Sequence, residues 1–435
     1  GRGGPEPVGR RRTPCRIMGG VPDPPRLAGP AAAAGRWRAL GRTTGIAIAA
    51  MRASRPRGVT RPAPGGELGR GVALRGTVWA GGDSRPYDGV VLVGADGRIA
   101  RIGPTWAVPI PVGVRVIGAF HTWVGPGIVD AHVHLAFGSA GQALRGGVVG
   151  VRDLGAPRVD ALRRRTGHRR PPPGSPYVGV AGPILTAPGG YPSRSWGAAG
   201  FASFVSNPGH ARIVVRGLAG DGVDVVKVAV ERGPEGGWPV PSTAVLRAVV
   251  EAAHGAGLKV VAHALSVEAV GRALDGGVDE LAHTPTERLP EPLVDRLAAA
   301  GVVVVSTLQT FFSGGGGRVA AANAVALHRA GVPLVYGTDL GNAGTRPGVD
   351  PRELDRLADA GLGRLGALRA ATERSARVAG VRLRTGRLEL GQPAAAVVLN
   401  GDPLVEPGVW RRPRVVVCDG RLVEPPEGQP DTLGG

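Results

Sequence analysis

The sequence predicts a parallel (β/α)8 barrel, to which both ends of the chain add a small β-sandwich. The middle of the chain alternates short apolar runs with helical periodicity, while both flanks carry short β-rich runs separated by turns. In addition, histidines or acidic residues follow several of the apolar runs. In a parallel barrel the active site lies at the carboxyl ends of the strands, where such residues would gather.

Eight strands are expected in the middle of the chain, at residues 127–131, 148–152, 177–181, 223–228, 259–262, 280–282, 302–306 and 333–336. Helices are expected between most of them, notably at 242–255, 266–276, 291–300 and 323–330. Several of these helical stretches close with glycine, which is typical of a helix C-terminus. A doubly wound open sheet is the alternative, but no G-x-G-x-x-G motif follows the first strand.

The β-rich flanks have strands expected at 72–79, 89–93, 98–102 and 115–117, and at 395–399, 414–418 and 421–423. We therefore expect a sandwich formed by residues 71–125 and 386–424 around a barrel formed by 126–385. Residues 1–70 are rich in Arg, Gly and Pro without sustained periodicity, which predicts a disordered leader, and 425–435 a disordered tail. The natural start is expected near Met51.

The net charge of +19 is unevenly distributed and does not indicate a nucleic-acid-binding surface. Residues 1–70 alone account for +11, and the remaining basic residues form no dense run. The only two cysteines, Cys15 and Cys418, exclude a disulfide scaffold and favour a reducing, cytoplasmic compartment. No apolar run is long enough to span a bilayer. We expect a small-molecule substrate, no nucleic-acid or membrane partner, and leave a homo-oligomer open.

His132 and His134 end the first barrel strand and are the centre of the functional prediction. Side chains two residues apart point to the same face of a strand, so the two imidazoles would project together. Two such nitrogens form half of a site for a metal such as zinc. Taken alone, the pair is explained equally well as two polar residues at a strand end with no role in metal binding.

Other polar residues follow later strands of the expected barrel. His263 and His283 end two of them, and Asp339 follows a third. Singly, a buried histidine is more often a core residue than a ligand, and an aspartate after Gly-Thr is often a helix cap. Their shared position at strand ends favours one common centre.

Lys227 lies inside an otherwise apolar strand, in a chain whose only other lysine is Lys259. Burial lowers the pKa of a lysine, and a neutral amine can take up carbon dioxide to form a carbamate with two metal-binding oxygens. The alternative is a lysine whose head group reaches solvent at a strand edge. Lys259 precedes its strand and is expected to be such a case.

Together these segments resemble the amidohydrolase superfamily, in particular its imidazolonepropionase-like and Xaa-Pro dipeptidase-like branch. The resemblance covers about residues 71–424, and its motifs lie at 126–135, 150–155, 185–190, 223–228, 262–264, 282–283, 337–342, 401–404 and 419–421. Two positions depart from the usual pattern. Ala282 and Thr284 flank His283 where relatives often have Glu and Gly, and residues 394–397 lack the usual Asp-Leu.

The resemblance implies a metal-activated water that hydrolyses an amide, cyclic amide or dipeptide C–N bond. It implies one divalent ion, zinc above all, on His132, His134 and Asp339. A second ion would lie on His263 and His283, with carbamylated Lys227 between the two. Relatives with a single ion exist, so one or two ions per chain are expected. Asp339 would then be the catalytic acid and base.

The substrate-binding residues expected near the mouth are Tyr191, Arg194 and Trp196, of which Arg194 suits a carboxylate. Loop packing is an equally good explanation for all three. Two alternatives to amide hydrolysis remain. The same centre could hydrolyse an ester, lactone or phosphotriester, or the chain could be a metal-free, non-catalytic scaffold that kept the fold.

Overall fold

The computed structural model describes Gly1 and residues 71–167, 169–233 and 236–423. The leader expected at 1–70 (apart from Gly1), the start expected near Met51 and the tail expected at 425–435 lie outside the described residues. None of the helices within the described ranges is long and apolar enough to cross a membrane.

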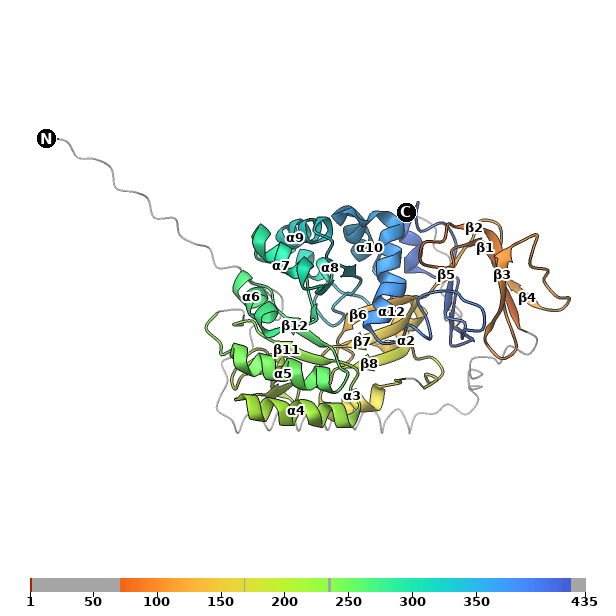
Figure 1. Cartoon of the computed structure of the whole chain (residues 1–435). Coiled ribbons are helices and arrows are strands. Elements are labelled where there is room, and N and C mark those ends of the chain that lie inside the picture. The colour runs from red at the N-terminus through yellow and green to blue at the C-terminus, as the bar shows by residue number, and fades with distance from the viewer. Residues whose placement is uncertain (2–70, 168, 234–235, 424–435) are drawn as a thin grey trace, which may run out of the picture. The chain divides into compact units, whose positions relative to one another are not determined.

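The middle of the chain is a mixed α/β fold built on parallel sheets (Figure 1). One sheet has the order β6-β7-β8 and the other the order β10-β9-β11-β12-β13-β14-β15. These strands are β6 (Ile128–Val133), β7 (Val148–Asp153), β8 (Tyr177–Val180), β9 (Ile184–Thr186), β10 (Ala202–Phe204), β11 (Val226–Ala229), β12 (Val260–His263), β13 (Glu280–Leu281), β14 (Val303–Val305) and β15 (Leu334–Val335). All eight strands expected in the middle of the chain are present.

The two strands that were not expected, β9 and β10, begin the seven-stranded sheet beside β11, whereas β8 ends the separate three-stranded sheet. Strand β9 pairs with β11 through Val228 and Leu185, whereas β8 pairs with β7. A backbone hydrogen bond of 2.8 Å from Asp224 N to Val180 O still joins the end of β8 to the segment before β11. The apolar run 184–186 is only three residues long, which is too short for a period-2 pattern to identify it.

Helices follow most of the parallel strands. They are α2 (Ala140–Arg145), α3 (Arg158–Arg164), α4 (Pro208–Asp221), α5 (Thr243–Gly255), α6 (Val267–Gly276), α7 (Glu291–Ala299), α8 (Leu308–Gly314), α9 (Gly317–Arg329), α10 (Pro351–Leu357), α11 (Gly363–Arg369) and α12 (Ser375–Val378). Figure 1 shows α4 and α5 side by side next to β11 and β12.

Helices α5 and α6 show how local sequence sets these boundaries. The hydroxyls of Ser242 and Ser266 accept hydrogen bonds from backbone N–H groups in the first turns, as N-cap residues do. Helix α6 ends at Gly277, whose φ of 82° is a left-handed conformation that glycine adopts without steric cost. Helix α9 begins at Gly317, six residues before its expected start, because the glycine-rich stretch before it obscured the helical pattern.

The main hydrophobic core lies between the parallel sheets and the helices, and Val, Leu and Ala form most of it. This agrees with the scarcity of aromatic residues, which make up 4% of the chain. Burying these branched side chains is the main favourable term in the stability of the fold.

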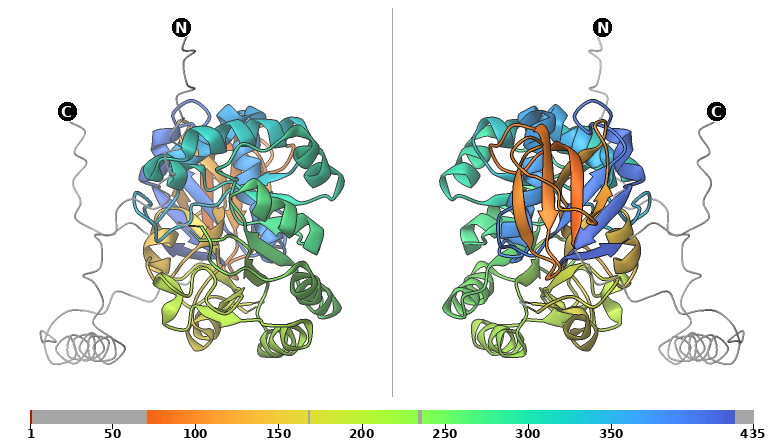
Figure 2. Two further views of the ribbon diagram at one scale, coloured as in Figure 1. Left: turned by 90° about the vertical axis from the view of Figure 1, so that its left-hand side faces the viewer. Right: turned by 90° about the vertical axis from the view of Figure 1, so that its right-hand side faces the viewer.

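The two ends of the chain meet in one eight-stranded sheet with the order β18-β17-β16-β5-β1-β2-β3, in which β4 also pairs with β1. Its strands are β1 (Val72–Val78), β2 (Tyr87–Val93), β3 (Ile99–Pro104), β4 (Arg115–Ile117), β5 (Trp123–Pro126), β16 (Ala396–Leu399), β17 (Val415–Cys418) and β18 (Arg421–Val423). The right-hand view of Figure 2 shows the first strands beside the last ones. Strand β5 ends at Pro126 and leads directly into β6, so this sheet anchors the strand that carries His132.

Asn323 of α9 holds the loop that follows His283. Its side-chain amide donates to the carbonyls of Pro285 (2.8 Å) and Glu287 (2.7 Å), and its Oδ1 accepts from the N–H of Leu289 (3.1 Å). The side chain is buried, so water cannot replace these three bonds.

We expect Asn323→Ala to lower the free energy of unfolding by about 2–4 kcal/mol, because it leaves buried backbone groups without partners. Asn400→Ala is the matched control: that side chain makes one exposed contact with Arg414, and its loss changes stability by less than about 0.5 kcal/mol. Urea unfolding of both variants measures the difference. Equal effects of the two substitutions would contradict the role given to Asn323.

Candidate metal centre

His132 and His134 are both oriented by hydrogen bonds from their ring Nδ1 atoms. Nδ1 of His132 lies 2.9 Å from the carbonyl oxygen of Ala282, and Nδ1 of His134 lies 3.3 Å from that of Gly155. A carbonyl only accepts, so each ring in its neutral form carries its proton on Nδ1 and presents a lone pair at Nε2. The two Nε2 atoms are 3.4 Å apart, which confirms that the imidazoles project together.

Asp339 reaches the two histidines from the segment after β15. The chain turns sharply there, with a φ of 54° at Asp339. The backbone of Gly337 passes close to His132, because a Cβ on Gly337 would lie 3.1 Å from the Cβ of His132. The buried carboxylate of Asp130 fixes this turn by accepting hydrogen bonds from the N–H and the hydroxyl of Thr338 (3.0 and 2.5 Å). It also accepts from the N–H of His132 at 3.1 Å.

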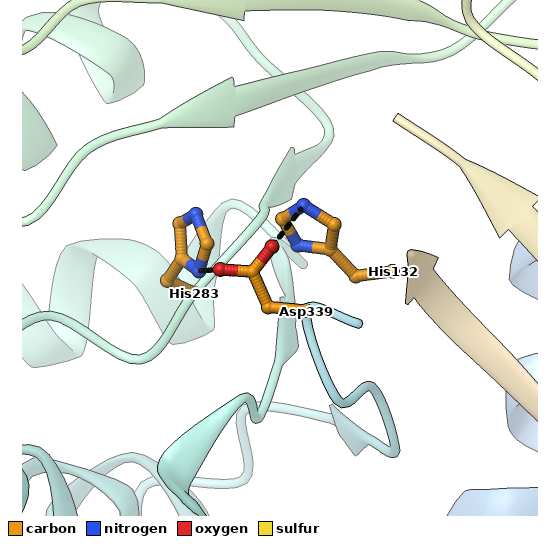
Figure 3. A group of neighbouring side chains, drawn as sticks. All are labelled: His132, His283 and Asp339. Atoms are coloured by element: carbon orange, nitrogen blue, oxygen red, sulfur yellow. Dashed lines mark ion pairs between the residues drawn. The ribbon is translucent and has the colours of Figure 1, made fainter. Parts of the chain in front are cut away.

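Three lone-pair atoms therefore converge at one point. Oδ1 of Asp339 lies 3.3 Å from Nε2 of His132 and 3.4 Å from Nε2 of His134. This Oδ1 is buried and accepts no hydrogen bond among the described residues. Figure 3 shows the carboxylate between the rings of His132 and His283.

His283 approaches Asp339 from the other side. Its Nδ1 lies 3.9 Å from Oδ2 of Asp339 and 3.0 Å from the hydroxyl of Thr307. His132, His283 and Asp339 can each offer one ligand atom, all within 4.8 Å of one another. The ring of Phe311, from α8, packs edge-on against His283 at a centroid distance of 5.6 Å.

His263 ends β12 and lies beside His283, with 4.9 Å between their ring centroids. Tyr191 stacks on the His263 ring at a centroid distance of 4.7 Å. Trp196 donates its indole N–H to the Tyr191 hydroxyl (3.1 Å) and meets the His134 ring edge-on at 5.1 Å. Arg194, in contrast, is exposed, and its guanidinium lies 5.8 Å from the centroid of Trp238.

Lys227 points into the fold from β11 and is almost fully buried. Its Nζ has no hydrogen-bond partner among the described residues, although an ammonium carries three donors. Arg152 and Glu280 form a buried ion pair of 2.7 Å nearby and influence its charge. Lys259 differs as expected: it is exposed and pairs with Asp279 at 2.6 Å.

Burial shifts the pKa values of the site towards neutral forms. Desolvation lowers the pKa of His263 to about 3 and holds the pKa of His132 and that of His283 well below the usual value. Desolvation also lowers the pKa of Lys227 to about 7, so an appreciable share of its amine is neutral near physiological pH. Neutral imidazoles are the form that binds metals.

Several contributors escaped the sequence prediction. Asp130 could have been found, because it shares a strand face with His132 by the same two-residue alternation. Phe311 lies within residues 309–317, which the sequence predicts to line the mouth of the site. Thr307 could not have been found, since it follows β14 in a turn where its φ is 43°. Such turns depend on contacts with distant residues rather than on local pattern.

The donor set fits a divalent cation. Two imidazole nitrogens and one carboxylate oxygen face each other within 3.3–3.4 Å, and when the rings are neutral a cation between these atoms would remove the repulsion of their lone pairs. Nitrogen and carboxylate ligands suit zinc and similar ions. The amine of Lys227 is a second buried group of this region that has no hydrogen-bond partner among the described residues. These features fit a divalent-cation site at the strand ends of a parallel α/β scaffold.

Comparison with known proteins agrees with this class. The sequence profile of the amidohydrolase family matches residues 123–423, so the chain belongs to the amidohydrolase family and is a hydrolase acting on carbon–nitrogen bonds. An uncharacterized protein of Mycobacterium tuberculosis is 29% identical over 343 residues, which are 70% of this chain and 86% of that protein.

Solved structures similar in fold include a Xaa-Pro dipeptidase with bound methionine (TM-score 0.70, 20% identity). Its match covers 82% of this chain and 100% of the other. A prolidase complexed with N-methylphosphonate-L-proline has a TM-score of 0.65 and 23% identity, over 81% of this chain and 99% of the other. These likenesses show that the chain shares the fold of those enzymes, and the family match confirms the resemblance to the amidohydrolase superfamily.

We expect the rings of His132, His263 and His283 to stay neutral at about pH 5 after metal removal with a chelator, where an ordinary histidine with a pKa of about 6.5 is mainly cationic. Ring ¹⁵N chemical shifts, assigned with single His→Gln variants, measure this. A cationic ring at any of the three positions at that pH would show that the site is more hydrated than the structure indicates.

Proposed function

We propose that this protein is a metal-dependent amidohydrolase that uses an activated water to cleave an amide, cyclic amide or dipeptide C–N bond in a small molecule. One observation carries the proposal: the lone pairs of His132, His134 and Asp339 converge within 3.3–3.4 Å of one another, and no donor lies between them. A metal-free scaffold would have no reason to retain so costly an arrangement.

We further propose that the two parallel sheets form a single (β/α)8 barrel spanning 126–385. The supporting contacts join β6 to the segment around β15, where Ala131 N donates to Tyr336 O (3.1 Å) and Asp339 N donates to His132 O (2.8 Å). At the other junction, Asp224 N donates to Val180 O.

A β-sandwich from residues 71–125 and 386–424 is proposed on similar grounds. Residues of β1 such as Leu74 share one buried cluster with residues of β16 and β17, including Val398 and Val417, although other strands lie between them in the sheet. A sheet that folds over onto itself would bring these side chains together.

For the metal, we propose zinc, with His132, His134 and Asp339 as ligands of one ion and His263 and His283 as ligands of a second. A carbamate on Lys227 would lie between the two. Its formation joins the neutral amine nitrogen to the carbon of CO₂ and releases one proton. The unpartnered Nζ and its pKa of about 7 support this chemistry.

When bound, such an ion supplies Lewis acidity that lowers the pKa of a coordinated water towards about 7. The chain's own residues do the rest. Asp339 keeps Oδ2 for proton transfer when Oδ1 is engaged, so it can take the proton of the attacking water and deliver it to the leaving amine. Asp130 and Thr338 hold that carboxylate in place, and Tyr191 and Trp196 limit access of bulk water from one side.

Substrate contacts are proposed for Tyr191 and Trp196, which touch the histidine rings, and for Arg194 as a carboxylate-binding group. The Xaa-Pro dipeptidase and prolidase resemblances favour a dipeptide-type substrate.

Hydrolysis of an ester, lactone or phosphotriester by the same centre is the second candidate, since it needs no other side chain. We place the protein in the cytoplasm on its cysteine usage, without nucleic-acid or membrane partners.

Metal analysis of the purified protein tests the centre. We expect about two zinc-like ions per chain, and fewer in Lys227→Ala because that substitution removes the amine from which the bridge forms. Lys259→Ala is the matched control and should retain the wild-type metal content, since Lys259 pairs with Asp279 on the surface. A wild-type protein that binds no metal would contradict the proposal.

Asp339→Asn tests the proton-transfer role. The amide keeps an oxygen at this position but cannot accept the water's proton, so we expect kcat to fall about 10²–10⁴-fold. The assay is a panel of N-acyl amino acids and Xaa-Pro dipeptides, with esters and lactones as a second panel. Asp355→Asn, an exposed aspartate paired with Arg364, is the control. Undiminished turnover in the Asp339 variant would assign the proton transfer elsewhere.

A further inference from the structure

An open cleft of about 430 Å³ lies beside the metal centre, and the proposed function does not yet use it. Its lining residues come from two segments that continue from the proposed ligands: five lie between 136 and 142, after His134, and five lie between 340 and 347, after Asp339. A hydrogen bond of 2.8 Å from His134 N to Leu340 O ties the two walls together. Small-molecule sites typically have volumes of about 300–1,000 Å³, so the cleft can hold part of a substrate.

Phe137 connects this cleft to the centre. Its ring stacks on Phe201 at a centroid distance of 5.5 Å and an interplanar angle of 13°, and it meets Trp196 edge-on at 6.0 Å. Trp196 in turn contacts the ring of His134. An aromatic surface therefore runs without interruption from a proposed metal ligand to the cleft wall.

The exposure of Phe137 is unusual for an aromatic cluster that serves only to pack the fold. Phe201 is 9% exposed, as expected of a packed ring, but Phe137 is 53% exposed and lines the cleft. Aromatic residues are scarce in this chain, at 4%. A half-exposed ring in a cleft next to a metal centre offers a face on which another flat apolar group can stack.

The remaining cleft wall restricts the chemistry of that group. Its side chains include the uncharged polar groups of Ser139, Gln142, Asn342 and Thr345, and no Asp, Glu, Lys or Arg is among the described residues that line it. A charged substituent would lose hydration there without gaining a countercharge. An uncharged ring, with or without a neutral polar substituent, matches both the aromatic face and the polar rim.

We propose that this cleft is the subsite for an uncharged aromatic substituent of the substrate and that Phe137 determines specificity for it. The inference rests on the proposed function, because it places the scissile C–N bond at the neighbouring centre. It narrows the substrate class to small amides or dipeptides that carry an aromatic ring close to that bond.

The first test measures binding and needs no turnover. The probe is 4-fluorobenzyl alcohol, a neutral ring without a C–N bond, followed by ¹⁹F NMR against the metal-loaded full-length chain. We expect binding that weakens about tenfold in Phe137→Ala, because the substitution removes the ring face on which the probe stacks. Trifluoroethanol, which lacks the ring, should not compete.

Phe120→Ala is the matched control, because Phe120 is 81% exposed and precedes β5 in the other sheet, outside the cleft lining. It should bind the probe like the wild type. Equal binding of the probe by Phe137→Ala and wild type would overturn the proposal, and so would equal losses in both variants.

The second test compares kcat/KM for paired substrates, such as Phe-Pro with Ala-Pro and N-acetylphenylalanine with N-acetylalanine. The wild type should prefer the ring-bearing member, and the preference should fall about tenfold in Phe137→Ala. Phe137→Leu should keep part of it. No preference in an active wild type contradicts the subsite. If the wild type hydrolyses none of these substrates, the result contradicts the proposed function instead. The binding measurement with the probe then tests the cleft independently.

Discussion

The carboxylate of Asp130 is the constraint on which the geometry of the centre depends. It joins β6, which carries His132, to the turn that presents Asp339, across 208 residues of sequence. Burial raises the pKa of this carboxyl to about 7, which means that the charged form is costly where it lies. Hydrogen bonds from His132 N and from both donors of Thr338 offset that cost.

Several buried polar groups near Asp130 lack hydrogen-bond partners among the described residues. Asp339 Oδ1 and Lys227 Nζ are buried without hydrogen-bond partners among the described residues, and burial lowers the pKa of His132 and that of His283, which favours their neutral forms. Proteins rarely leave such groups unpaired in their interior. These groups are contributed by strands of both parallel sheets and converge in one region, as expected of a site that binds a cation. Polar pairs elsewhere, such as Arg165 with Asp224, satisfy one another.

Part of this arrangement followed from local sequence. The two-residue alternation correctly predicted that His132 and His134 project together, and the lysine within a valine run correctly predicted a buried amine. The same reasoning predicted all eight middle strands, although it missed β9 and β10 because their apolar runs are three residues long or partly polar. It also treated Arg194 on a par with Trp196, whereas the structure brings only Trp196 to a histidine ring.

Local sequence sets which residue types follow which strands, and these motifs identify the family and the candidate ligands of the site. Spacing of two along a strand, glycine after a helix and a lysine among valines are local features with local physical causes. Only the tertiary structure decided which groups meet: Asp130 with Thr338, Phe311 with His283, and Phe137 with the cleft. These contacts join residues far apart in the chain through turns such as those at Thr307 and Asp339, whose left-handed backbone is stabilised by the surrounding packing and hydrogen bonds rather than by the residues themselves.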